Sequence, residues 1–256
     1  MDAARQGQRY LEGQPDYNRV WPGTMHAECE ETRMLQRVID SMRARGAFAS
    51  IDIHNNTGIN PHYACINRVD NRFLHLASLF SRTVVYFIRP LGVQSMAMSR
   101  VCPAVTIECG KPNHEYGTAH ARDYIDACLH LQALPDHPVA SHDVDLFHTV
   151  ATVKRPEQVS FGFADEAGDL CLLSDIDHLN FRELPTGTPL GWLRDGASLQ
   201  LDVRDDNDQD VQDRYFAVTE NRLVTARPLM PSMFTLDKDI IRQDCLGYLM
   251  ERLLPQ

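Results

Sequence analysis

The sequence lacks the features that mark membrane, secreted and nucleic-acid-binding proteins. No apolar run approaches the roughly 18 residues that a membrane-spanning helix needs. The N-terminal stretch MDAARQGQRYLEGQ has no apolar core of a signal peptide. There is no block of lysines and arginines, and 25 basic against 35 acidic residues give a formal charge of −10. We therefore expect a soluble, cytoplasmic protein with no nucleic-acid or membrane partner.

The cysteines lack the spacing of a zinc knuckle or a disulfide framework. The chain has seven of them, an odd number, and no CxxC pair occurs. Several sit in apolar runs such as RVCPAVTIECG. This usage is typical of reduced cysteines in the core of a cytosolic protein.

Helix and strand patterns alternate in the first half of the chain. Residues 28–45 begin with acids, end with arginines and place Met34, Val38, Ile39 and Met42 at helical spacing. Further helices are predicted over 69–82 and 115–134, and strands over 47–53, 83–89 and 103–110. This order predicts an α/β fold with a mixed central sheet flanked by helices.

The pattern of residue types changes after Leu134. The stretch PDHPVASHDVD has no periodicity, and short alternating runs with turn signals follow it. We predict a catalytic-type α/β domain over residues 1–135 and a smaller β-rich domain over 136–256. The last segment, DCLGYLMERLL at 244–254, is predicted to be a terminal helix.

Two polar residues close apolar strands. His54 ends SIDIH and Glu108 ends PAVTIE, and ligands of open α/β sheets gather at the carboxyl ends of strands. Asp52, two residues before His54, is placed to hold the imidazole. A loop histidine with satisfied hydrogen bonds and an exposed strand-end glutamate would give the same pattern.

The upstream segment QRYLEGQPDYNRVWPG is too polar and rich in turn residues for a core element. It contains Arg9, Asn18 and Arg19. An arginine presents a planar fork of donors to a carboxylate or an oxyanion, and a neighbouring asparagine can hold a second oxygen. An arginine in a surface salt bridge is the alternative.

Taken in order, RYLEGQPDYNRVWPG, DIHNNTG and TIECGKP resemble the zinc carboxypeptidase superfamily, and within it the succinylglutamate desuccinylase and aspartoacylase branch. The resemblance covers roughly residues 3 to 130. It implies a zinc carboxypeptidase-like α/β domain followed by a smaller β-rich domain. It also implies hydrolysis of an amide bond beside a carboxylate, in an N-acyl amino acid or a peptide, by water that one zinc ion activates.

The resemblance also implies a role for each site residue. His54 matches a zinc ligand, and Glu108 matches the glutamate that takes a proton from zinc-bound water and passes it to the leaving amine. Asn18 and Arg19 match the pair that binds the substrate carboxylate. Arg9 matches an arginine that polarises the scissile carbonyl.

The chain departs from the branch at the other two zinc ligands. These should come from a His-x-x-Glu turn upstream of Asn18, yet none of the 17 residues before Asn18 is a histidine. We expect Met1 to lie inside the domain, with about 50–80 residues missing before it, the size of one strand-helix-strand unit and its turn. We considered His26 with Glu30, His62, and His114 with Glu115 and His120 as substitutes, and assigned none.

The sequence thus leaves two functions open. One is a zinc-dependent amidohydrolase or carboxypeptidase-like enzyme. We expect this chain alone to have little or no such activity, because a catalytic zinc needs three protein ligands. The other is a non-enzymatic homologue that binds a small carboxylate ligand. A sheet that lacks its first strand would also expose an edge, so a homo-oligomer is possible.

Overall fold

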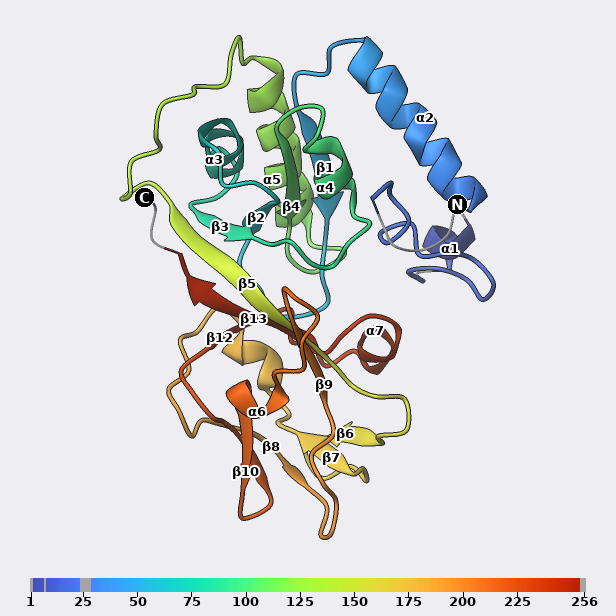
Figure 1. Cartoon of the computed structure of the whole chain (residues 1–256), viewed down its shortest axis with the longest axis vertical. Helices are drawn as coiled ribbons and strands as arrows, with labels where there is room; N and C mark the ends of the chain where they lie inside the picture. The colour runs from blue at the N-terminus through green and yellow to red at the C-terminus, as the bar shows by residue number, and fades with distance from the viewer. Residues whose placement is uncertain (1, 7, 24–28, 254–256) are drawn as a thin grey trace.

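A computed structural model describes residues 2–6, 8–23 and 29–253 (Figure 1). A sheet of eight strands runs through the molecule. Its spatial order is β1 (Ser50–His54), β4 (Ala104–Glu108), β2 (Tyr63–Ile66), β3 (Thr83–Tyr86), β5 (Asp145–Lys154), β13 (Gly247–Arg252) and β12 (Met230–Ser232), with β9 (Asp202–Asp205) also paired to β5. Parallel and antiparallel pairs both occur in it, which confirms the predicted mixed sheet.

The second sheet is smaller and lies in the lower part of Figure 1. It has five strands in the order β10 (Phe216–Thr219), β11 (Arg222–Thr225), β8 (Pro189–Leu193), β7 (Leu170–Leu172) and β6 (Phe161–Phe163). The helices are α1 (Asp2–Arg5), α2 (Glu30–Ala44), α3 (Asn71–Ser78), α4 (Gln94–Met98), α5 (Glu115–Leu129), α6 (Gln212–Tyr215) and α7 (Lys238–Gln243), with a 3₁₀ turn at Ile176–Leu179. No helix in the described ranges is long and apolar enough to cross a membrane.

Strands β5 and β13 pair along their length and join the two parts of the molecule (Figure 1). One core surrounds Ile66, Leu76 and Ile107 beneath the helices of the first half. The other surrounds Leu172 and Leu190 near the small sheet. Because β5 pairs with β3 on one side and β13 on the other, the large sheet takes strands from both halves of the chain. The domain boundary at residue 135 stays a prediction.

The predicted terminal helix over 244–254 is wrong. Residues Gly247–Arg252 form β13, which lies between β5 and β12 and has strand partners on both sides. Leu249 and Met250 are both buried although they are adjacent. A short apolar run that is buried on two faces cannot be told from a buried helix by periodicity, and here the two neighbouring strands decide the outcome.

Helix α2 confirms the helix predicted over 28–45, although only one of the four apolar residues at helical spacing is buried. Cys29 caps its first turn, since the Cys29 Sγ accepts a hydrogen bond from the backbone N–H of Thr32 at 3.4 Å. Ile39 is buried, whereas Met34, Val38 and Met42 are 40%, 40% and 42% exposed. The helix therefore lies at the margin of the fold and packs through a narrow stripe.

Strand β1 positions the candidate site. It pairs in parallel with β4, and the register sets His54 opposite Glu108. Both strands end at this pair, so both side chains lie at the carboxyl edge of the sheet, as predicted. The other side of β1 has no strand partner among the described residues, and self-association through this edge stays a prediction.

Candidate active site

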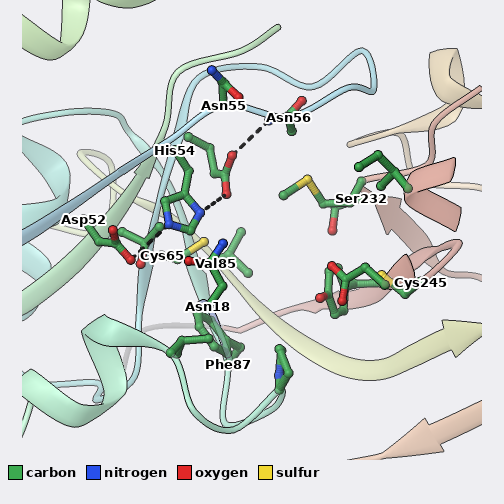
Figure 2. A pocket seen from close by; sticks show the side chains of 18 of the residues that line it. Asn18, Asp52, His54, Asn55, Asn56, Cys65, Val85, Phe87, Ser232 and Cys245 are labelled. Atoms are coloured by element: carbon green, nitrogen blue, oxygen red, sulfur yellow. Dashed lines mark hydrogen bonds and ion pairs between the residues drawn. The ribbon is translucent and has the colours of Figure 1, made fainter. Parts of the chain in front are cut away.

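A cavity of about 610 Å³ opens beyond the ends of β1 and β4. Its wall includes all five residues that the sequence singled out, from three separate segments: Arg9, Asn18, Arg19, His54 and Glu108. The opposite wall comes from the C-terminal part of the chain and includes Ser232 and Cys245 (Figure 2). The fold therefore brings the predicted residues together around one space, while their roles stay proposals.

His54 is held between two carboxylates (Figure 2). Its Nε2 lies 3.0 Å from Oδ2 of Asp52, and its Nδ1 lies 3.6 Å from Oε1 of Glu108. Glu108 is buried, and its Oε2 accepts a hydrogen bond from Nδ2 of Asn56 at 3.1 Å. Asp52 and His54 are two residues apart in one strand, so their side chains share a face. The prediction that Asp52 orients the imidazole is consistent with this contact.

The two carboxylates fix the charge of the imidazole. Burial alone lowers the pKa of His54, but the hydrogen bond with Asp52 and the contact with Glu108 outweigh it and raise the pKa to about 10. The raised pKa means that the His54 imidazole binds its proton more tightly in the folded protein than in the unfolded chain, where histidines have a pKa of about 6.5. This stabilisation is fully present below about pH 6.5 and is lost as the pH rises toward the folded value.

We expect the His54 imidazole of the metal-free chain to stay protonated between about pH 6 and 8, because Asp52 and Glu108 both favour its charge. Nuclear magnetic resonance of the ring Cε1–H signals measures this directly. The variant Asp52→Asn should lower the His54 midpoint. A wild-type midpoint near 6.5 would contradict the assignment.

The turn that follows His54 forms hydrogen bonds with the C-terminal part of the chain and packs against it. Asn60 Oδ1 accepts a hydrogen bond from the backbone N–H of Met233 at 3.0 Å. The hydroxyls of Thr57 and Thr235 lie 2.8 Å apart. Gly58 is buried against the backbone of Phe234. These contacts explain why a polar turn follows β1, since its side chains satisfy backbone and hydroxyl groups of a distant segment.

Gly58→Ala should destabilise the fold by about 1–3 kcal/mol, because a Cβ at Gly58 would overlap the carbonyl oxygen of Phe234 and force the two segments apart. Chemical denaturation measures the free energy of unfolding. Asn55→Ala, at an exposed position of the same turn, is the matched control and should change stability by less than about 0.5 kcal/mol. Equal stability of the two variants would show that the turn adapts freely.

The two arginines share a carboxylate that the sequence analysis missed. Arg19 Nη2 lies 2.7 Å from Oδ1 of Asp244, and Arg9 Nη1 lies 2.9 Å from its Oδ2. Arg9 also binds Asp16 through its Nε at 2.8 Å. Asp16 in turn accepts a hydrogen bond from the backbone N–H of Asn18. Arg9 and Arg19 thus form a fork of donors aimed at one carboxylate.

Asp244 follows α7, far along the chain from both arginines. Burial alone would raise the pKa of Asp244, but Arg19 and Arg9 outweigh it and hold the pKa below its usual range. The carboxylate is therefore ionised at neutral pH. No local signal in the sequence links Asp244 to Arg9, since 235 positions separate them.

The described residues do not fit a catalytic zinc ion. No group of three or more histidine, cysteine, aspartate and glutamate side chains converges among them in a way that could hold a metal. Both ring nitrogens of His54 face carboxylates instead. Three protein ligands are typical of a catalytic zinc, and the described residues do not provide such a set around His54.

The other histidines that could act as substitutes lie elsewhere. His62 and His120 pair with each other, with their Nδ1 atoms 2.7 Å apart, and stack with Tyr116. Neither lines the cavity. His114 precedes α5 and is exposed. The pair His26 and Glu30 is not testable, because His26 lies outside the described residues.

The fold has clear counterparts among solved structures. The chain has the fold of succinylglutamate desuccinylase/aspartoacylase structures. A succinylglutamate desuccinylase from Chromobacterium violaceum superposes with a TM-score of 0.57 at 18% identity, over 99% of this chain and 72% of that one. A succinylglutamate desuccinylase/aspartoacylase from Rhodobacter sphaeroides superposes with a TM-score of 0.58 at 16% identity, over 99% of this chain and 72% of that one.

Murine aminoacylase 3 is also similar, with a TM-score of 0.59 at 12% identity, over 99% of this chain and 82% of that chain. Compared by sequence, the chain matches no protein-family model and no curated protein. At identities this low, the superpositions establish the fold alone. That fold agrees with the resemblance predicted from the sequence. The alignments span nearly the whole chain, including the second half, which lies beyond the residues 3 to 130 that carry the sequence resemblance.

Proposed function

We propose that this cavity binds a small N-acyl amino acid or peptide with a free carboxylate, and that the 256-residue chain by itself hydrolyses it slowly or not at all. The observation that supports the proposal best is the convergence of Arg9, Asn18, Arg19, His54 and Glu108 on one cavity. The neighbours with this fold are named as desuccinylase, aspartoacylase and aminoacylase proteins. Their names describe removal of an acyl group from an amino acid.

Each side chain has a place in this proposal. Arg19 and Asn18 bind the ligand carboxylate, and Arg9 faces the acyl carbonyl, where its guanidinium would stabilise negative charge on the oxygen. Glu108 accepts a hydrogen bond from the ligand amide and is the group placed to take a proton. His54, held in the cationic form by Asp52 and Glu108, orients Glu108.

The second candidate is zinc-dependent amide hydrolysis, which the resemblance implies. One observation favours it, namely that His54 and Glu108 stand opposite each other at the ends of adjacent strands. It needs two more metal ligands than the described residues bring to the cavity. We therefore propose zinc hydrolysis only for a form in which a His-x-x-Glu element joins this site. The free cysteines are consistent with the proposed cytoplasmic location.

Isothermal titration calorimetry with N-succinylglutamate tests the proposal. We expect saturable binding of one ligand per chain, because the arginine fork recognises a carboxylate. The matched control ligand is the same compound with its carboxylates converted to neutral amides, which should bind at least about tenfold more weakly. Equal affinity for the two compounds, or no binding of either, would contradict the proposal.

A further inference from the structure

The carboxylate that fills the arginine fork belongs to the protein itself. Asp244 gives one oxygen to Arg19 and the other to Arg9 at 2.7 and 2.9 Å. This is the arrangement in which a pair of arginines binds a carboxylate ligand. The structure therefore shows that the fork can bind a carboxylate, and shows which one binds it in the free chain.

The contact lies at the cavity surface and is not sealed in the core. Arg9, Arg19 and Asp244 all line the cavity. Their side chains keep 18%, 25% and 17% of their accessible surface. An incoming ligand can therefore reach the fork from the same space into which Asp244 projects.

The contact partners at this corner carry equal numbers of positive and negative charges, with Lys154 as a further cation that acts on Asp244. Arg9 and Arg19 bring two positive charges, while Asp16 and Asp244 bring two negative charges at contact distance. A ligand carboxylate that entered beside them would place three anions against two cations in a half-buried site, where like charges repel strongly. The ligand must therefore exchange with Asp244 and cannot add to it.

We propose that Asp244 is a tethered internal ligand of the Arg9–Arg19 fork, which an external carboxylate must displace, and that Asp244 thereby sets the affinity and selectivity of the cavity for carboxylates. The inference rests on the proposed binding function. A tethered group competes at an effective concentration in the millimolar range or above. The measured affinity for an external ligand equals the affinity of the free fork multiplied by the fraction of molecules in which the fork is free.

Only ligands that engage both arginines displace Asp244, because a single contact does not replace the two that Asp244 makes. The tether therefore selects against small anions that lack a second polar group. It favours ligands that bring a carboxylate together with a neighbouring carbonyl, which is the chemistry of an N-acyl amino acid.

The test is the affinity of Asp244→Asn for N-succinylglutamate, measured by isothermal titration calorimetry. Asparagine keeps the shape and removes the charge, so we expect binding at least about tenfold tighter than in the wild type. Asp239→Asn is the matched control. Asp239 lies in α7, the helix that ends just before Asp244, is 80% exposed and pairs with Arg242, so its change removes the same charge and should alter the affinity by less than about twofold.

The outcomes separate this inference from the proposed function. If the wild type binds and a folded Asp244→Asn binds equally or more weakly, Asp244 is a structural partner of the arginines and the inference fails while the binding function stands. If neither protein binds, both fail. If both proteins bind and Asp244→Asn binds more tightly, both are supported. If Asp244→Asn binds where the wild type does not, the inference is supported and the proposed binding by the wild type fails.

A measurement on the wild type makes the test independent of how the variant folds. With aspartate labelled by carbon-13 at the side-chain carboxyl, the Asp244 signal should move when N-succinylglutamate saturates the chain, because Asp244 loses its arginine partners. The signal of Asp239 should not move. An Asp244 signal that stays in place at saturation would overturn the proposal.

Discussion

Arg19→Ala should weaken the binding of N-succinylglutamate by roughly 10- to 100-fold, the loss expected when a charged hydrogen-bond partner of a carboxylate is removed. Titration calorimetry measures it. Arg19→Lys keeps the charge but not the planar fork, so it should recover only part of the affinity. Unchanged binding by Arg19→Ala would remove Arg19 from the carboxylate site.

The same substitution should also cost stability, because it leaves Asp244 half-buried with Arg9 as its remaining arginine partner. We expect a loss of about 2 kcal/mol in the free energy of unfolding. The double variant Arg19→Met, Asp244→Asn removes both charges and should regain most of that stability. A double variant as unstable as Arg19→Ala would show that the Asp244 carboxylate is not the source of the loss.

The purified chain should retain fewer than about 0.1 zinc ions after dialysis, because one histidine does not supply the coordination energy that sites with a full ligand set reach. Its hydrolysis of N-succinylglutamate should match the uncatalysed rate. Elemental analysis and release of glutamate measure the two quantities. His54→Ala is the control and should have the same zinc content.

A zinc content near one per chain in the wild type that His54→Ala abolishes would contradict this expectation. It would show that residues outside the described ranges, or a rearrangement of Asp52 and Glu108, complete a metal site around His54. Zinc that remains bound in His54→Ala would lie at another site.

The site positions that could be predicted are those with local signals. His54 and Glu108 end apolar strands, and the rule that ligands gather at the carboxyl ends of strands places them together without knowledge of the register. The register of β1 against β4 then sets them directly opposite each other. Arg9, Asn18 and Arg19 stood out because a polar, turn-rich segment offers no core role for them.

The features that escaped prediction depend on contacts between distant segments. Asp244 is one aspartate among many until the fold sets it between Arg9 and Arg19. The sequence of β13 resembles a helix because its adjacent residues Leu249 and Met250 are buried in two different cores, and its pairing with β5 and β12 leaves no mark in its own pattern. The exposure of Met34 on α2 likewise depends on what the helix packs against, since spacing alone predicts only which residues share a face.

The central claim is that this chain binds carboxylate ligands through its arginine fork and does so without zinc. The most direct test is to titrate N-succinylglutamate into the chain twice, once after treatment with a chelator and once with zinc added. The account predicts saturable binding in both titrations, with dissociation constants that agree within about twofold. Binding that appears only when zinc is present would contradict it.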